Sequence, residues 1–452
     1  MLKIIGFEID KEVLPCYNQD KMGGLMKENY LLKSKEAESL YRAVKDLPII
    51  DYHNHISVAD IKSDRRFDNL YEIWLECDPY KHRLMRICGV PEEFITGDRA
   101  PYEKFERFVK LLPMLAGNPV YDWAKMELST VFGIDDPAVA EKPEYLYDKC
   151  SEMLRSEEFS TKNILKRFNI EYQSPICSLT DDLSYYGADG LAPSLRGDDL
   201  LSPTDRTVAT ISSKTGIKIE NEDSYVKAVS VMLDRFSEKG CRVADHALDS
   251  DFFANDTDGS RVRILTALCA EYAKRNMLLL LHLDAKRDTS ERLAKLAGPF
   301  GGYAAVGGSL DITKLIKLLD RTERYGALPN TVLFPLNLSD LPALSVLQGS
   351  FSENGVASKV QLGPAWWWCD HRMGIESTLS SISSFGVLSE FIGMTTDSRS
   401  ILSFVRHDYF RRILCSFLVK QNEELDWELS GGTLTRIAEK ICYENAKTKI
   451  GR

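Results

Sequence analysis

The chain has 452 residues, of which 44% are hydrophobic and 27% charged, and its formal net charge is -10. This is the composition of an ordinary globular protein, and it excludes collagen-like, coiled-coil and intrinsically disordered chains. The acidic balance disfavours a nucleic-acid partner, and no stretch approaches the roughly 18 apolar residues of a membrane-spanning helix. Because the N-terminus also lacks the apolar core of an export signal, we expect a cytoplasmic protein that binds neither nucleic acid nor membrane.

Short apolar or β-branched runs recur eight times along the chain, and each run ends in polar residues. Such runs are typical of strands that are buried on both faces of a parallel sheet. In chain order the predicted strands cover residues 47–55, 174–182, 191–196, 241–246, 277–282, 331–337, 360–363 and 391–397. Amphipathic helical patterns fill most of the intervals, for example at 224–239, 262–275 and 311–325.

This alternation of strand and helix predicts an α/β fold of the closed (β/α)8 type, the TIM barrel. Barrels of this type often exceed the usual domain size, so residues 1–452 are predicted to form a single domain. The polar residues fall at the carboxyl ends of the predicted strands, and the active sites of such barrels lie on that face. The strand ends are therefore the place to look for functional residues.

One interval is far longer than an ordinary connection between strands. Residues 60–172 separate the first two predicted strands and contain helical patterns such as 102–115 and 143–155. We interpret this stretch as a helical insertion that stays within the single domain and caps the barrel mouth. An N-terminal extension over 1–46 and a helical tail over 423–452 complete the predicted architecture.

Ten cysteines are scattered along the chain, and none forms a CxxC pair with another. Several lie in apolar runs, as Cys177 and Cys241 do. We therefore expect reduced core residues rather than a disulfide or zinc framework.

The sharpest local signal is a pair of histidines, His53 and His55, at the end of the first predicted strand. Residues i and i+2 of a strand point to the same face, so both imidazoles can converge on one ion in the barrel mouth. Asp397 ends the eighth predicted strand, which neighbours the first in a closed barrel, and it is the predicted third ligand. Imidazole suits zinc, iron, nickel or copper, and a carboxylate extends the choice to manganese. A hydrogen-bonded histidine pair without a metal is the alternative.

Two further histidines, His246 and His282, also end predicted strands, so four of the seven histidines fall on one rim. His282 is a candidate fourth metal ligand or a contact for a substrate. For His246 a purely structural role is an equally good interpretation.

Arginines are the next group at the predicted mouth. Arg196 ends the third predicted strand, and Arg399 follows Asp397 by two residues; Arg287 and Arg406 follow the fifth and eighth strands. Converging arginines can bind a carboxylate or phosphate bidentately, although a surface salt bridge is the alternative for each. Trp366 could line a sugar-binding wall or pack the barrel rim. Neither GxGxxG, a Walker A motif nor GxSxG occurs in a fitting context, so a nucleotide and a serine nucleophile are not indicated.

These motifs resemble the uronate isomerase (glucuronate isomerase) family of the amidohydrolase superfamily over nearly the whole chain. The resemblance rests on short runs that are spread from the first predicted strand to the last. They include DYHNH at 51–55, RLMRICGVP at 83–91, ITGD at 95–98, GNPVY at 117–121, TDD at 180–182, GCR at 240–242, FIGM at 391–394, TDSRS at 396–400 and RHDYFRRILC at 406–415.

The resemblance implies a distorted barrel with one divalent metal ion, which we expect to be zinc, and a small sugar acid as substrate. It implies aldose–ketose isomerisation of D-glucuronate to D-fructuronate, of D-galacturonate to D-tagaturonate, or of both, with a proton moving between C2 and C1 through an enediol. Asp397 and Tyr80 match family positions that handle protons or polarise hydroxyls. Arg399 is a third catalytic candidate, because an enediolate needs a nearby electrophile. A homo-oligomer is a further expectation from the family.

The chain departs from the family pattern near the expected substrate. Pro79 stands where the family usually has histidine, and His82 stands where it usually has tryptophan. Asp284 and Gly308 replace a glycine and an aspartate of the family pattern. His82 is a candidate replacement for the missing histidine.

Two other functions compete with the isomerase prediction. A metal-dependent hydrolase of a sugar-acid lactone is the first, because related barrels activate a metal-bound water. A non-catalytic protein that binds a sugar acid is the second, and the number of reactive side chains at the predicted mouth argues against it.

Overall fold

The computed structural model describes residues 28–136, 140–187, 190–287, 289–299, 301–326 and 328–451. Its main sheet has seven strands in the order β1-β2-β3-β4-β5-β8-β9, and all neighbouring pairs are parallel. The strands are β1 (Ile49–Asn54), β2 (Ile170–Ser178), β3 (Ser194–Arg196), β4 (Val243–Leu248), β5 (Leu278–Leu283), β8 (Thr331–Pro335) and β9 (Val360–Leu362). Seven of the eight predicted strands are therefore confirmed, and their residues form the centre of one continuous hydrophobic core.

Helices flank this sheet, as the amphipathic patterns predict. The main ones after β3 are α10 (Asp205–Thr215), α11 (Glu222–Glu238), α13 (Ser260–Lys274), α15 (Ile312–Tyr325), α18 (Arg372–Phe385), α19 (Val405–Glu424) and α20 (Gly431–Glu439). The three helices predicted from periodicity correspond to α11, α13 and α15. Among the described residues, none of the helices is both long and apolar enough to cross a bilayer.

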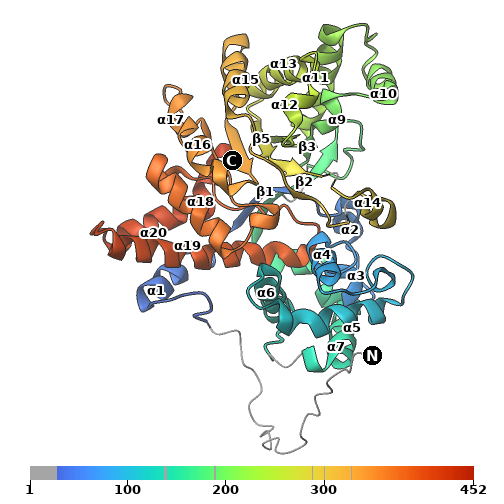
Figure 1. Cartoon of the computed structure of the whole chain (residues 1–452), viewed down its shortest axis with the longest axis vertical. Helices are drawn as coiled ribbons and strands as arrows, with labels where there is room; N and C mark the ends of the chain where they lie inside the picture. The colour runs from blue at the N-terminus through green and yellow to red at the C-terminus, as the bar shows by residue number, and fades with distance from the viewer. Residues whose placement is uncertain are drawn as a thin grey trace, which may run out of the picture.

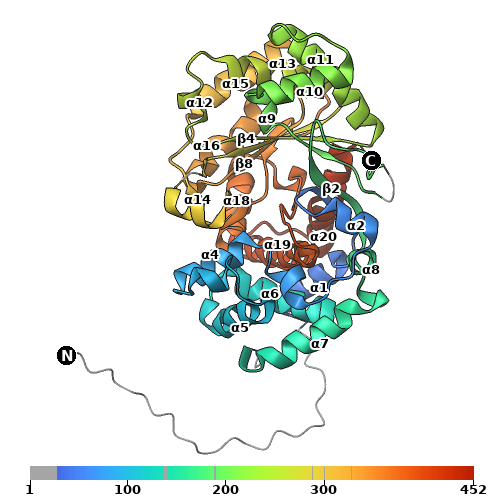
Figure 2. The ribbon, with the colours of Figure 1, turned by 90° about the vertical axis from the view of Figure 1, so that its right-hand side faces the viewer.

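Between β1 and β2, where the sequence predicts an insertion, the described residues form helices and 3-10 turns but no strand. They are α2 (Val58–Ser63), α3 (Leu70–Trp74), α4 (Pro79–Ile87), α5 (Pro101–Leu111), α6 (Pro119–Phe132), α7 (Pro143–Arg155), α8 (Thr161–Arg167) and three short 3-10 turns. Figures 1 and 2 show α4 to α7 gathered at the end of the molecule opposite α10, α11, α13 and α15, with the sheet between the two groups. That these parts form a single domain stays a prediction.

The eighth predicted strand differs from the prediction, because residues 391–397 form no regular strand. Gly393 and Asp397 have φ angles of 83° and 46°, which are incompatible with extended backbone. The segment nevertheless runs beside β1: His55 N–H donates to the Ser398 carbonyl at 2.8 Å, and Asp397 N–H donates to the His53 carbonyl at 3.2 Å. The barrel is distorted at this seam, as the family resemblance implies.

Side-chain hydrogen bonds replace the missing ladder at this seam. The fully buried Asp51 carboxylate accepts from the Thr395 hydroxyl, from the Thr396 backbone and hydroxyl, and from Asn54, and His407 lies 3.1 Å from it. Thr395 also accepts from the His53 backbone N–H at 2.9 Å. Asp51 thus fixes the relative position of the two segments that carry His53 and Asp397.

A small antiparallel hairpin follows β5, and the sequence analysis missed it. It consists of β6 (Ala285–Lys286) and β7 (Ala305–Val306), with α14 (Glu291–Ala297) in between. Arg83 of α4 donates to the carbonyls of Gly302 and Ala304, so the hairpin is fastened to the insertion. Strands of two residues are too short to produce a periodic pattern.

The cysteine prediction is confirmed in its main point for the described part of the chain. The nine cysteines there are free thiols, and most are buried. Cys77 and Cys88 are exposed instead of lying in the core. Cys16, like the first 27 residues of the predicted N-terminal extension, lies outside the described residues.

Candidate active site

A cavity of about 630 Å³ lies at the carboxyl ends of the strands. Strand ends and insertion helices both contribute to its wall. The lining includes His53, His55, Cys77, Pro79, Tyr80, Arg196, Asp245, Asp249, His282, Arg287, Trp366, Trp367, Asp397, Arg399 and Arg406. The structure therefore brings all the predicted site residues to one cavity.

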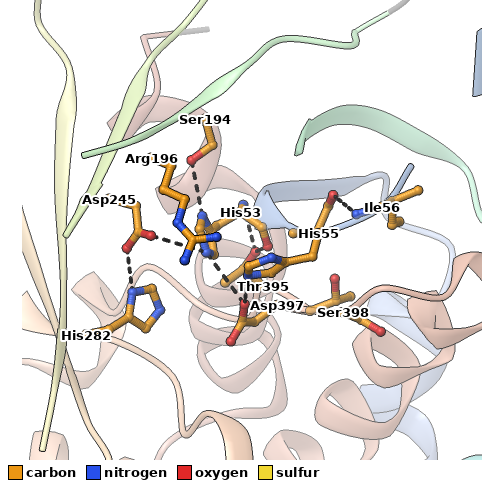
Figure 3. A network of polar contacts seen from close by, with 12 residues as sticks. His53, His55, Ile56, Ser194, Arg196, Asp245, His282, Thr395, Asp397 and Ser398 are labelled. Atoms are coloured by element: carbon orange, nitrogen blue, oxygen red, sulfur yellow. Dashed lines mark hydrogen bonds and ion pairs between the residues drawn. The ribbon is translucent and has the colours of Figure 1, made fainter. Parts of the chain in front are cut away.

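His53, His55 and Asp397 form a compact group at the seam between β1 and the irregular segment. Asp397 Oδ1 lies 3.0 Å from His55 Nε2 and 3.6 Å from His53 Nε2. One ligand atom from each of the three residues lies within 4.8 Å of the other two. His53 is almost completely buried, and Ser194 Oγ lies 3.1 Å from its Nδ1, which leaves Nε2 facing the carboxylates (Figure 3).

Asp245 and His282 form a second group that shares His53. His282 Nδ1 lies 2.6 Å from Asp245 Oδ1, and Asp245 Oδ2 lies 3.9 Å from His53 Nε2. Ligand atoms of His53, Asp245 and His282 also fall within 4.8 Å of one another. Figure 3 shows Asp245 and His282 together on one side of His53.

Asp245 was missed as a site residue, although strand alternation contains the signal for it. Asp245, Ala247 and Asp249 all line the cavity, and they are two residues apart along the chain. Because successive side chains of a strand point to opposite faces, the residue between Asp245 and Ala247 must point away from the cavity. That residue is His246, whose Nε2 lies 2.9 Å from the Tyr272 hydroxyl of α13. His246 is fully buried and absent from the cavity wall, so its structural interpretation is the correct one.

The electrostatics of the group favour a cation. Burial lowers the pKa of His53 to about 4, so its imidazole is neutral at physiological pH. Burial alone would raise the pKa of Asp397, but its hydrogen bond to His55 and the nearby imidazoles hold that pKa well below the usual range. Burial would also raise the pKa of Asp245, but the charge of His282 and its hydrogen bond to Asp245 hold that pKa well below the usual range. Two ionised carboxylates beside a neutral imidazole create a negative site in a buried place.

This donor set fits a divalent metal ion. Two imidazole nitrogens and one carboxylate oxygen are a ligand combination that zinc accepts, and a catalytic zinc site keeps a further position open. The neutral His53 and the ionised Asp397 are in the protonation states that metal binding requires. His282 Nε2 is buried without a hydrogen-bond partner and lies in the same cavity wall, so the imidazole is available to a further ligand or to a substrate.

The four arginines differ in how firmly they are held. Arg196 lies 3.7 Å from Asp198 and is about one third exposed, while Arg287 lies 3.2 Å from Asp249 and against the Trp367 ring. Arg399 lines the cavity beside Asp397. Arg406 is the exception, because it is buried and held by protein groups on several sides.

Arg406 belongs to a cluster of aromatic side chains that we call the tyrosine cluster: Tyr80, Trp123, Trp368 and Arg406. Tyr80 packs edge-on against Trp123 and Trp368, with ring centroids 5.6 and 5.3 Å apart. The Arg406 guanidinium lies over the Trp123 ring at 3.8 Å and over the Tyr80 ring at 4.9 Å. Burial raises the pKa of Tyr80 well above its usual value, although Arg406 opposes this. Tyr80 is therefore a neutral hydroxyl in the cavity wall.

The start of α4 determines where Tyr80 lies. The Asp78 carboxylate caps the helix by accepting from the Tyr80 and Lys81 backbone N–H groups, and Pro79 occupies the first helical turn, where its missing N–H costs nothing. The buried Lys81 ammonium lies 3.0 Å from Asp78 and holds this cap in place. A short helix with a strong cap thus presents Tyr80 to the cavity.

The three consecutive tryptophans stack in sequence. Trp366 and Trp367 are parallel within 10°, and Trp367 and Trp368 within 11°. Trp366 contacts the His282 ring edge-on, with centroids 4.6 Å apart, and both Trp366 and Trp367 line the cavity. The row connects the strand ends to the tyrosine cluster.

The departures from the family pattern have different surroundings. Pro79 lines the cavity, and its carbonyl lies so close to Gly302 that a Cβ there would approach it to 2.3 Å. His82 is buried but does not line the cavity, so it does not replace the missing histidine. Asp284 is buried beneath the hairpin, where Leu310 N–H donates to it; burial and the nearby Asp340 raise its pKa to about 7.

Comparisons with known proteins agree on one family. A sequence model described as "Glucuronate isomerase" matches residues 22–265 and 255–449. The chain is 34% identical to a "Uronate isomerase" of Caldanaerobacter subterraneus subsp. tengcongensis over 95% of this chain and 100% of the relative. It is 36% identical to a "Uronate isomerase" of Bacillus licheniformis over 94% of this chain and 97% of the relative.

A solved structure gives the same result for the fold. The crystal structure of uronate isomerase from Thermotoga maritima superposes with a TM-score of 0.86 at 26% sequence identity. The superposition covers 94% of this chain and 99% of that one. The similarity therefore includes the insertion helices as well as the barrel.

Proposed function

The chain belongs to the glucuronate isomerase family, and on this premise we propose that it converts D-glucuronate to D-fructuronate, D-galacturonate to D-tagaturonate, or both. In this aldose–ketose isomerisation the C2 proton leaves, an enediol forms between C1 and C2, and a proton is added at C1. A proton moves from the C2 hydroxyl to the C1 oxygen as well, so the sugar acid is isomerised without gain or loss of atoms. The observation that carries the proposal is the cavity in which His53, His55 and Asp397 converge and which Tyr80 also lines.

We assign the metal-holding role to His53, His55 and Asp397, and we propose zinc as the ion. The neutral imidazole of His53 and the ionised carboxylate of Asp397 support the assignment. A bound zinc ion would polarise the substrate oxygens at C1 and C2, which acidifies the C2 proton. His282, held by Asp245 at 2.6 Å, then faces the same oxygens as a substrate contact.

Two groups of this chain are suited to moving protons. Asp397 is ionised and can accept a proton. A bound metal ion would reduce the basicity of this carboxylate. Tyr80 is neutral and can donate its hydroxyl proton or a hydrogen bond. Arg399 lines the cavity next to Asp397, where its charge would stabilise negative charge on an enediolate.

Arginines and tryptophans account for the recognition of a sugar acid. Arg196 lies 3.7 Å from Asp198 and is partly exposed in the cavity, so its guanidinium can turn to a substrate carboxylate. Trp366 offers a flat apolar surface beside His282 for the sugar ring. Arg406 is the predicted substrate contact that fits least well, because Asp370, Thr396 and the aromatic rings already surround its guanidinium.

The experiment that tests the proposal follows each uronate in heavy water by NMR. We expect loss of the C2–H signal and appearance of the keto acid with at least one of the two uronates. The comparison variant is H53A/H55A, which keeps the rest of the cavity lining but lacks two of the three assigned ligands. Metal-replete protein that exchanges no proton and forms no keto acid contradicts the proposal.

The lactone-hydrolase alternative predicts a different result. Hydrolysis of an aldonolactone releases acid, which a pH indicator detects. The family relatives are named for isomerisation, and this disfavours hydrolysis. Acid release without isomerisation would favour the hydrolase function over the isomerase function.

We further propose that the enzyme works in the cytoplasm as a homo-oligomer. The free thiols of the described residues agree with a reducing compartment. The oligomeric state is an expectation from the family alone, and sedimentation of the purified protein tests it.

A further inference from the structure

A buried ion network lies behind Tyr80, and the proposed mechanism does not use it. Its centre is the Lys81 ammonium of α4, which is only 2% exposed. The ammonium lies 3.0 Å from Asp78 and 3.6 Å from Glu127 of α6, and it donates to the Trp74 carbonyl at the end of α3 at 2.6 Å. Glu127 is equally buried and also accepts from the Trp74 indole N–H at 2.5 Å. Charges are costly to remove from water, so a buried network of this kind calls for a physical explanation.

We propose that Lys81 is a positioning residue for the isomerisation: it joins α4 to α3 and α6, and it thereby fixes where Tyr80 lies in the cavity wall. The inference rests on the proposed function, because it assumes that Tyr80 handles a proton of the substrate. Lys81 itself does not line the cavity, so it acts through Tyr80 and not on the substrate.

The first argument concerns the start of α4. Asp78 Oδ1 accepts from the Tyr80 backbone N–H at 2.9 Å and from the Lys81 backbone N–H at 3.1 Å, while Asp78 Oδ2 faces the Lys81 ammonium. One carboxylate oxygen is therefore engaged in the helix cap and the other in the ion pair. Although Asp78 lines the cavity, these contacts make it part of the helix start and not a candidate base. The ammonium thus orients the group that fixes the backbone of Tyr80.

The second argument concerns the register between α4 and α6. Trp123 and Glu127 are four residues apart on α6, so their side chains lie on the same face of the helix. Trp123 packs edge-on against the Tyr80 ring, with centroids 5.6 Å apart. Glu127 pairs with Lys81, the residue that follows Tyr80 on α4. A shift of α4 along α6 would break the ion pair and the ring contact together, so the ion pair holds the Tyr80 ring beside Trp123.

The third argument is the balance of charge. One ammonium faces two carboxylates; Lys81 and Glu127 are buried, and the Asp78 side chain is only 11% exposed. An ammonium has three hydrogens to donate, and the acceptors here come from the end of α3, the cap of α4 and α6. Without the ammonium the two carboxylates would repel each other, and the start of α4 would move away from α6.

The insertion also supplies a matched control. Lys104 of α5 is buried too, and its ammonium lies 3.5 Å from the Tyr71 hydroxyl. Neither Lys104 nor Tyr71 lines the cavity. The variant K104M therefore removes a buried ammonium beside a tyrosine without touching the proposed site.

The test compares K81M, E127Q and K104M by kcat, KM and zinc content, each alone and combined with Y80F. In K81M we expect kcat to fall about 100-fold, because a misplacement of about 1 Å costs this much, while KM and zinc content stay nearly unchanged. E127Q keeps the pair of Lys81 with Asp78 and an acceptor for Trp74, so we expect it to fold even if K81M does not. Its kcat should fall in the same direction by a smaller factor. K104M should behave as the unaltered enzyme.

The combination with Y80F distinguishes positioning from a general structural role. If Lys81 acts through Tyr80, then K81M and E127Q cost little further in kcat once the Tyr80 hydroxyl is absent. Loss by the same factor with and without the hydroxyl contradicts the inference.

A second measurement is independent of turnover. The Tyr80 ring lies edge-on to two indole rings, so its NMR signal in protein with ¹³C-labelled tyrosine reports on its position, and Y80F assigns the signal. We expect the signal to move in K81M and in E127Q but not in K104M. An unmoved signal in E127Q contradicts the positioning role. Absence of C2–H exchange in the unaltered enzyme contradicts the isomerase proposal instead.

Discussion

Two sides of the cavity are built in different ways. The rim, formed by His53, His55, Asp245, His282 and Asp397, comes from strand ends and from the segment clamped to β1. The tyrosine cluster comes from α4, α6, α19 and the turn after β9. On the rim, carboxylates and imidazoles lie within hydrogen-bond or ligand distance of one another, whereas the cluster holds a single guanidinium among aromatic rings.

The difference suggests that the rim binds the metal and that the tyrosine cluster provides a group for proton transfer. The rim concentrates negative charge on a rigid sheet, and such a place can hold a cation. The tyrosine cluster holds a hydroxyl whose pKa is raised by burial, so the hydroxyl stays neutral. Variants of the rim should therefore lose metal and activity together, while variants of the cluster should lose activity and keep the metal.

The largest effect is expected from the rim. In H53A/H55A two of three assigned ligands are missing, so bound zinc should fall to background and turnover should fall below detection. Metal analysis after gel filtration and the NMR assay measure the two losses. H371N is the matched control, since His371 caps α18 and lines no part of the cavity. Full metal content in the double variant contradicts the ligand assignment.

The second effect is expected from the tyrosine cluster. Y80F removes one hydroxyl, and loss of a proton-handling group typically costs about 100-fold or more in kcat. Zinc content should stay unchanged, because Tyr80 is not one of the assigned ligands His53, His55 and Asp397. Y145F, on an exposed side chain of α7, should change neither quantity. If Y80F loses zinc as well, the proposal that the tyrosine cluster does not contribute to metal binding is wrong.

A smaller effect should come from the clamp behind the rim. D51N removes the charge that holds Thr395 and Thr396 against β1, and with it the alignment of Asp397. Mutations that disturb the support of metal ligands typically weaken metal affinity by about 10–100-fold. Competition with a chelator of known affinity measures the change. An affinity equal to that of the unaltered protein would show that the seam needs no such clamp.

The smallest effect is expected from substrate recognition. R196M removes a partly exposed guanidinium, and loss of a hydrogen bond to a charged group costs about 1.5–3 kcal/mol. We expect KM to rise about tenfold or more with kcat and zinc content nearly unchanged. A fall in kcat with constant KM would show that Arg196 acts in the chemical step and not in substrate binding.

The sequence predicts the rim better than the cluster, for a physical reason. Strand alternation and strand order are sufficient to place His53, His55 and Asp397 together. The same alternation, applied to β4, places Asp245 toward the cavity and His246 away from it. Asp245 was missed because the prediction considered the residue type of His246 and not the spacing along the strand. The position of residues 391–397 beside β1 could be predicted. Their irregular backbone could not, because the apolar pattern does not reveal the positive φ angles at Gly393 and Asp397.

The tyrosine cluster depends on packing between distant segments, which periodicity does not encode. Tyr80 was found only through the family resemblance, and its contacts with Trp123 and Arg406 join parts of the chain that lie far apart in sequence. The β6–β7 hairpin was not predicted because its two-residue strands are too short to produce a periodic pattern.

The most direct test of the account follows C2–H exchange of the preferred uronate in heavy water through removal and return of the metal. We predict that chelation abolishes exchange, that zinc restores it in the unaltered protein, and that zinc restores nothing in H53A/H55A. Exchange that continues at full rate in protein shown to be free of metal would contradict the central claim that His53, His55 and Asp397 form the metal centre of an isomerase.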